Sequence, residues 1–251
     1  MAISKRGKLN DGAKIDAHLL SSYCPLTSHH LISHSLFYKV STPRQKQMHD
    51  HHYNFDKHKN LVLLPSKDES KAKIIACYYA LPWHSSGHTG NQIIKHYNNS
   101  EKGKAVGKSD NPFGGNKAQG KGNNLTEDEL KMYNADAKKL EKTKGYHKVV
   151  SSLFLTVLKK LKCNQSNSEY QGYLDSLSED ICSLISDFDL LLSNPGYDFA
   201  SGQDGCNSSG CGDREHTKER TVGLWLSDYV ISAYVNNEAE DRLNLLSELQ
   251  G

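Results

Sequence analysis

The chain has 251 residues, of which 36% are hydrophobic and 24% charged, so it can bury one large core or two modest ones. This composition excludes an intrinsically disordered chain. No run of about 18 apolar residues occurs, and the first residues lack an apolar stretch, so we expect neither a membrane segment nor a secretory signal peptide.

Charge is distributed unevenly along the chain. Residues 1–164 hold 27 Lys and Arg against 13 Asp and Glu, whereas residues 165–251 hold 4 against 16. A basic half favours nucleic acid as a partner, because Lys and Arg that replace condensed counterions supply most sequence-independent affinity. We predict a basic domain over 1–164 and an acidic helical extension over 165–251, which either packs on the same core or forms a separate module.

In chain order, the first elements surround a set of histidines. A strand or extended segment is expected over 27–37, and a polar connection follows from residue 42. The apolar run 61–64, bounded by proline, suits a buried strand or the start of a helix. A short amphipathic element over 70–81 leads to a second histidine cluster.

The later elements are predicted to be helices. Residues 98–124 are rich in Gly, Asn and Lys and read as a flexible insertion. Thr126 and Glu129 form a capping box that begins a helix over 130–144. Further segments carry apolar residues at the helical period: 146–161, 170–192, 222–235 and 238–249. The pattern predicts a mainly α (α+β) fold.

Two histidine clusters have the outline of a metal site. His29 and His30 are adjacent, so on a strand they point to opposite faces and are poor candidates to bind one ion together. One can hold a cation while the other takes a proton from water, because imidazole has an ordinary pKa of about 6.5. His84 and His88 are four residues apart, and a single helical turn would bring both onto one face. The result is three ligands and one base.

The order of these motifs resembles the HNH/endonuclease VII nuclease superfamily. Residues 27–37 read Thr-Ser-His-His-Leu-Ile-Ser-His-Ser-Leu-Phe, residues 53–65 end in Asn-Leu-Val-Leu-Leu-Pro, and residues 81–88 read Leu-Pro-Trp-His-Ser-Ser-Gly-His. These are similar to the AHH nuclease family of bacterial polymorphic toxins. Ser28 replaces that family's alanine, and Gly87 lies one place later than the family's glycine.

This resemblance implies a small ββα-metal core elaborated by several helices. It implies a metal-dependent, sequence-tolerant endonuclease that acts as an antibacterial toxin on DNA and is restrained by a cognate immunity protein. Such a toxin would be cytoplasmic in the producer and delivered into a target cell by a specialised secretion system. His30 would be the general base and Asn60 the hairpin asparagine that fixes the backbone beside it.

The resemblance also implies a ligand set and a substrate groove. His29, His84 and His88 would hold one divalent ion, which all-imidazole ligation allows to be zinc, nickel, manganese or magnesium. His58 and His147 are possible additional ligands. Three lysines are candidates for contact with phosphates: Lys57, Lys59 and Lys95.

Several alternatives remain open. In a non-catalytic zinc module that binds nucleic acid, a fourth protein ligand would close the site, and the same chemistry could act on RNA. A zinc protease is excluded because Ser85 stands where its glutamate is needed. Cys206, Cys211 and His216 allow zinc, a local disulfide or free thiols, and free thiols are the default in a reducing cytoplasm.

Overall fold

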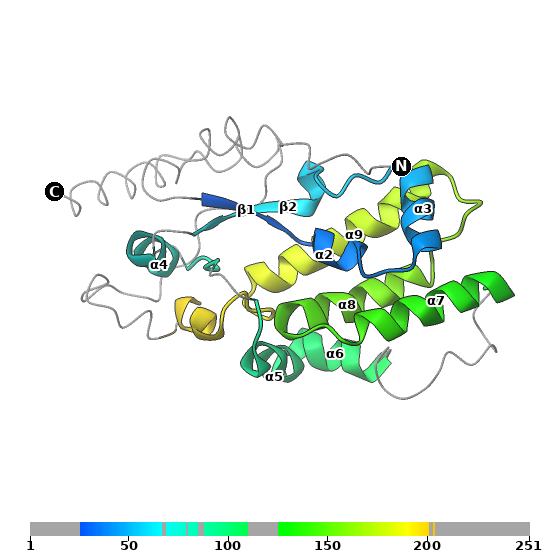
Figure 1. The fold of residues 1–251 in the computed structure, drawn as a ribbon. Coiled ribbons are helices and arrows are strands. Elements are labelled where there is room, and N and C mark those ends of the chain that lie inside the picture. The colour runs from blue at the N-terminus through cyan, green and yellow to red at the C-terminus, as the bar shows by residue number, and fades with distance from the viewer. Residues whose placement is uncertain are drawn as a thin grey trace. The chain divides into compact units, whose positions relative to one another are not determined.

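The computed structural model describes residues 26–66, 69–78, 80–84, 88–109, 125–200 and 203. Within them the chain is mainly helical with one small two-stranded antiparallel sheet, which confirms the predicted fold class (Figure 1). The chain divides into two compact units. Unit 1 comprises residues up to 29, 61–86 and from 195 onwards, and unit 2 comprises residues 30–60 and 87–194.

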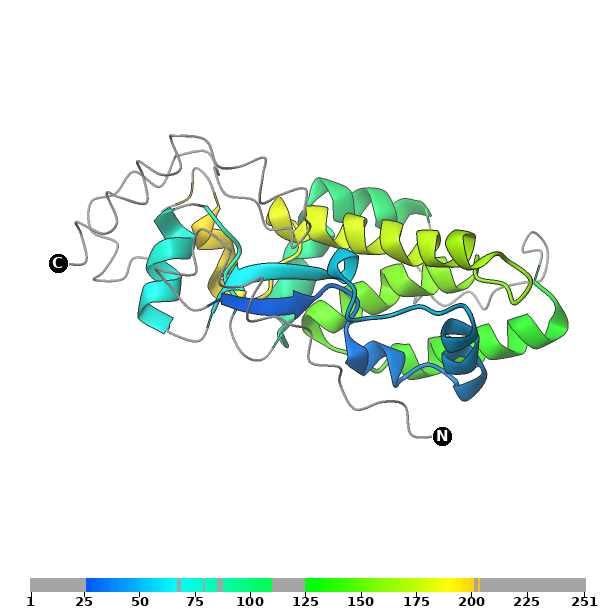
Figure 2. The same ribbon diagram turned by 90° about the horizontal axis from the view of Figure 1, so that it is seen from above.

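Unit 1 is built on the sheet. Strand β1, Leu26–His30, pairs with β2, Leu61–Pro65 (Figure 2). All five residues of β2 are buried, which explains why it reads as a continuous apolar run rather than an alternating one. Helix α4, Glu69–Tyr78, packs against β2. In the same unit, the ring of Phe199 in η2, Asn194–Phe199, contacts the edge of Trp83 at 5.9 Å between centroids.

Unit 2 is a helical assembly around α8, Gly145–Leu158, which is buried along most of its length. Its neighbours are α5, Asn91–Asn99, α7, Glu127–Leu140, and α9, Asn167–Ser186 (Figure 1). Unit 2 also contains four further elements among the described residues: α2, His34–Phe37; α3, Thr42–Asp50; η1, His58–Asn60; and α6, Glu101–Ser109.

Local capping explains where two of these helices begin. The predicted capping box of α7 is confirmed: the Glu129 N–H donates to Thr126 Oγ1 at 3.3 Å, and the Thr126 N–H donates to Glu129 Oε2 at 2.8 Å. At α9 the Glu169 N–H donates to Ser166 Oγ at 3.2 Å. These bonds satisfy N–H groups that a helix start leaves without a partner.

The extended segment expected over 27–37 is too long. It ends at His30, and α2 begins at His34. The polar connection expected from residue 42 is helix α3, with Ser41 at its N-cap and a proline in its first turn. Proline suits that place because the first N–H groups of a helix have no internal partner.

The flexible insertion predicted over 98–124 is helical in its first part. Helix α6 occupies Glu101–Ser109, and Ser100 Oγ accepts the Gly103 N–H at 3.0 Å as its cap. Helix α9 ends at Ser186, earlier than the predicted end near residue 192, and Phe188 follows with a positive φ of 61°. The helices predicted over 222–235 and 238–249, and Cys206, Cys211 and His216, lie outside the described residues.

The predicted boundary near residue 164 falls between α8 and α9. These two helices pack against each other in unit 2, so the residues of α9 share the core that α8 provides. Among the described residues, no helix combines the length and the apolar character needed to cross a bilayer.

Candidate metal and acid–base site

Two groups of side chains among the described residues have the composition of a metal site. One contains His29 and His84 of unit 1, which are two of the three ligands expected from the sequence. The other consists of His30, His34 and Asp56. The structure therefore offers possible metal-binding groups at both members of the adjacent histidine pair.

In unit 1, His29 and His84 lie together. His29 comes from β1 and is 5% exposed, and its ring centroid is 5.1 Å from that of His84. Backbone contacts hold His84 in place. The His84 N–H donates to the Pro65 carbonyl at 3.1 Å, and His84 forms a parallel bridge with Ser66. Burial lowers the pKa of His84, which favours the neutral imidazole that ligates cations.

The expectation that one helical turn carries both His84 and His88 is wrong at His84. That residue lies in a bridge and not in a helix, because its backbone pairs with the end of β2. The helix that follows β2, α4, ends at Tyr78, before the histidines. The ββα arrangement expected around the ion therefore lacks a helix that carries His84.

In unit 2, His88 is fixed by the start of α8. Its carbonyl accepts the Tyr146 N–H at 3.0 Å, and its ring centroid is 5.4 Å from Tyr146 and 5.8 Å from His147. Gly145 permits this approach: its φ is +55°, and a Cβ there would lie 2.3 Å from the His88 carbonyl oxygen. The first residue of α8 therefore has to be glycine.

The structure describes the surroundings of one of the two additional ligands suggested by the sequence, His147. His147 lies beside His88, and its Nδ1 is 3.5 Å from Ser33 Oγ. Burial, together with the charge of Lys39, lowers the pKa of His147. His58 begins η1, but its side chain lies outside the described part of the structure.

His30 has surroundings of its own in unit 2. Its Nε2 lies 2.9 Å from Asp56 Oδ1, and Nε2 of His34 lies 2.8 Å from the same oxygen. Burial alone would raise the pKa of Asp56, but hydrogen bonds from His34 and His30 outweigh it and the pKa is lowered. The side chains of His30, His34 and Asp56 are 28%, 29% and 20% exposed, so solvent reaches this cluster.

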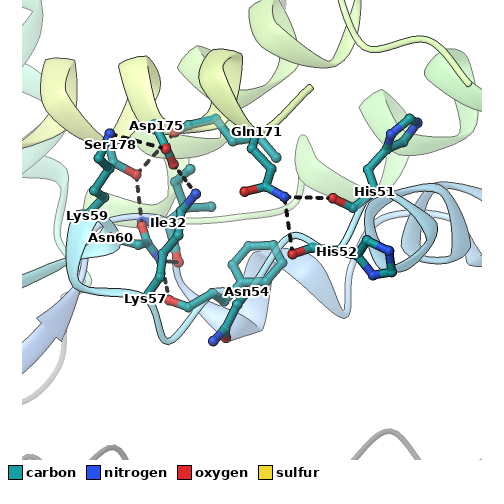
Figure 3. A network of polar contacts seen from close by, with 12 residues as sticks. Ile32, His51, His52, Asn54, Lys57, Lys59, Asn60, Gln171, Asp175 and Ser178 are labelled. Carbon is teal, nitrogen blue, oxygen red and sulfur yellow. Dashed lines mark hydrogen bonds and ion pairs between the residues drawn. The ribbon is translucent and has the colours of Figure 1, made fainter. Parts of the chain in front are cut away.

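Asn60 fixes the backbone that presents this cluster. It is fully buried, and its Oδ1 accepts the Ile32 N–H at 2.8 Å while its Nδ2 donates to the Ile32 carbonyl at 2.9 Å (Figure 3). Its Nδ2 also donates to the Phe55 carbonyl at 2.8 Å. Ser178 of α9 donates to the same Oδ1 at 3.0 Å. Asn60 thus forms hydrogen bonds with both the segment after His30 and the residue before Asp56, so it is a positioning residue for this cluster.

The three lysines predicted to contact substrate differ in their surroundings. Lys57 is 17% exposed and pairs with Asp175 of α9 (Figure 3). Its ammonium lies 4.6 Å from the centroid of the Tyr53 ring. Lys59 is 53% exposed and lies 3.7 Å from the same carboxylate. Lys95 is exposed on α5. The charge of Lys57 is therefore matched inside the protein, whereas Lys59 and Lys95 face solvent.

Sequence reasoning missed His34 and Asp56. The spacing of His30 and His34, four residues apart, was a usable signal, and it was equal to that of His84 and His88. Asp56 had no local signal, because it is 26 residues from His30 and reaches it through the fold.

Comparisons of the chain with protein-family models, with curated proteins and with solved structures give no match. We therefore infer function from the motif residues and from their geometry.

Proposed function

We propose that the chain is a metal-dependent endonuclease in which His29, His84 and His88 hold one divalent ion and His30 is the general base. The observation that carries this proposal is the separation of two consecutive histidines. His29 is buried beside His84, whereas His30 is partly exposed beside Asp56. One neighbour therefore suits a ligand and the other suits a base.

The donor set fits a divalent ion. Imidazole nitrogens are ligands for zinc, nickel and manganese, and the lowered pKa of His84 keeps its ring in the ligating form. When bound, the ion would stabilise negative charge that develops on the scissile phosphate.

His30 would take a proton from the attacking water. If its Nε2–H donates to Asp56, the lone pair is on Nδ1, and Nδ1 is the atom that accepts the proton. Asp56 then holds the ring in that tautomer, while Asn60 holds the backbone on which the ring is carried.

The substrate we propose is nucleic acid, with DNA favoured over RNA. The excess of Lys and Arg in residues 1–164 supports a polyanionic substrate, and Lys59 and Lys95 are exposed cations in that region. The likeness of the motifs to polymorphic toxins supports a toxin role, a cognate immunity protein as partner, and delivery into a target cell.

The proximity of His147 to His88 favours a second candidate, a closed zinc module without catalysis. A fourth histidine on the ion would leave no position for water or substrate. Metal binding that persists with no cleavage of DNA or RNA would identify this module.

A plasmid-nicking assay with and without chelator, beside calorimetric metal titration, tests the proposal. His30→Ala should slow cleavage by roughly 10² to 10⁴ while the affinity of the three-histidine ion stays nearly unchanged, because a general base makes no bond to that ion. His29→Ala, His84→Ala and His88→Ala should lose both cleavage and that ion. The matched control is His49→Ala, because His49 is 79% exposed on α3.

Two results would count against this assignment. Cleavage by all four variants at the normal rate would place the active site elsewhere. Loss of the ion in His30→Ala together with its retention in His29→Ala would exchange the two roles. The same assay on RNA decides the sugar preference.

A further inference from the structure

We propose that His30, His34 and Asp56 form a second divalent-cation site of the zinc type, and that an ion there switches the nuclease off by occupying the general base. The site itself stands on geometry in unit 2. Its inhibitory effect rests on the proposed function, in which His30 accepts the proton from water.

The three ligand atoms already converge. His30 Nε2, His34 Nε2 and one Asp56 oxygen lie within 4.8 Å of one another, and each imidazole nitrogen is within 2.9 Å of Asp56 Oδ1. Ligands that bind zinc at about 2.0–2.2 Å in a tetrahedron are about 3.3–3.5 Å apart. A small widening of each nitrogen–oxygen separation would therefore admit an ion.

The backbone around the cluster is held in place before any ion binds. His30 ends β1, and His34 begins α2. Asn60 bonds the intervening Ile32, and it also bonds Phe55, the residue before Asp56. Preorganised ligands lose little conformational freedom on binding, so the free energy of ion binding is not reduced by the entropy cost of ordering a loop.

The donor set and its exposure indicate the class of ion. Two imidazoles and a carboxylate suit zinc, cobalt, nickel or manganese, whereas calcium and magnesium prefer oxygen ligands. The three side chains are between 20% and 29% exposed, so an ion can enter from solvent and complete its coordination with water. In the cation-free form, the imidazoles donate hydrogen bonds to Asp56 instead.

Occupancy of this site and base catalysis by His30 exclude each other. An imidazole whose Nε2 binds an ion carries its proton on Nδ1, so it has no lone pair left to accept a proton from water. Zinc beyond the amount that fills the three-histidine site should therefore inhibit cleavage.

Zinc stoichiometry of the full chain tests the site without reference to activity. Equilibrium dialysis followed by elemental analysis should give one zinc fewer per chain for His34→Gln and for Asp56→Asn than for the wild type. His84→Ala should lose a different zinc, so the double variant His34→Gln/His84→Ala should lose two. His49→Gln is the matched control, and circular dichroism checks that each variant is folded.

Equal zinc content in the wild type, His34→Gln and Asp56→Asn would overturn the site and would identify a hydrogen-bonded cluster only. Loss of the same single zinc in His34→Gln and His84→Ala would also overturn it. If no form cleaves nucleic acid, the proposed function fails, but the stoichiometry still decides whether this second site exists.

The inhibition has a separate test in the nicking assay. The rate of each protein is expressed relative to its own rate at low zinc. On this scale His34→Gln should need at least about tenfold more zinc than the wild type for half-inhibition, because one ligand is missing. Equal zinc sensitivity of the two proteins would overturn the inhibitory role while leaving the stoichiometry result intact.

Discussion

Two polar networks of unit 2 combine a carboxylate with nitrogen donors, yet they differ in burial. Asp136 accepts hydrogen bonds from the Ser41 N–H at 2.7 Å and from Arg44 Nε at 3.2 Å, and Arg44 also donates to Gln47 and to the Leu161 carbonyl. Arg44 and Asp136 are 1% and 0% exposed. In the other network Asp56, His30 and His34 are between 20% and 29% exposed.

Burial separates a structural carboxylate from one that can bind a ligand. The buried network connects α3, α7 and the segment that follows α8, and both oxygens of Asp136 accept hydrogen bonds within the protein. Removal of one partner there leaves an uncompensated charge in a low-dielectric interior. The Asp56 cluster can exchange its internal hydrogen bonds for water or an ion at low cost.

Substitution of the buried carboxylate Asp136 should lower stability more than any other change considered. Asp136→Ala should lower the free energy of unfolding by about 3–5 kcal/mol, because Arg44 would remain buried without its carboxylate. Urea unfolding measures this change. Asp50→Ala is the control, since Asp50 forms an exposed pair with Lys46 on α3 and its loss should be nearly neutral. A similar small cost for Asp136→Ala would remove the contrast between the networks.

The next effect concerns Asn60. Asn60→Ala leaves three buried groups of Ile32 and Phe55 without partners, and at about 1 kcal/mol or more for each unsatisfied group the expected loss is at least about 3 kcal/mol in total. Asn98→Ala, on the exposed side of α5, should be nearly neutral. Ser178→Ala removes a single bond to Asn60 and should cost about 1 kcal/mol. Equal costs for Asn60→Ala and Asn98→Ala in urea unfolding would contradict the positioning role.

Zinc should stabilise the exposed cluster but not the buried one. At a free zinc concentration about a hundredfold above the dissociation constant of one site, binding adds about 2.7 kcal/mol to the free energy of unfolding. The wild type should gain this amount beyond what His34→Gln gains, and a thermal-shift titration measures it. The same increment in both proteins would show that zinc binds elsewhere.

The sequence was sufficient to predict helices whose local signals agree with their burial. Helix α8 was predicted because its apolar residues follow the helical period, and α7 was predicted because Thr126 and Glu129 form a capping box. The apolar run 61–64 and its proline allowed a buried strand or the start of a helix, and the structure has the strand β2. These signals depend on residues close together in the chain.

The sequence did not predict features in which polar residues form hydrogen bonds with partners far along the chain. Helix α3 buries the polar residues Arg44 and Gln47, so its sequence has no apolar stripe. Arg44 is buried there because Asp136, far along the chain, accepts a hydrogen bond from it. In the candidate site, the separate surroundings of His29 and His30 were predicted from the strand period. Asp56 was not, because its place depends on Asn60 and on α9 behind it.

Asp56→Asn should have little effect on stability and a clear effect on zinc binding. In the zinc-free chain, Asp56→Asn should lower the free energy of unfolding by less than about 1 kcal/mol, because the carboxylate and its imidazoles are partly exposed and the asparagine oxygen can still accept a hydrogen bond. Zinc content should nevertheless fall by one ion per chain, since a neutral amide is a much weaker ligand than a carboxylate. Urea unfolding and zinc dialysis on the same preparation measure the two quantities separately. A cost comparable to that of Asp136→Ala would make Asp56 a structural carboxylate, and the contrast between the two networks would then be one of exposure alone.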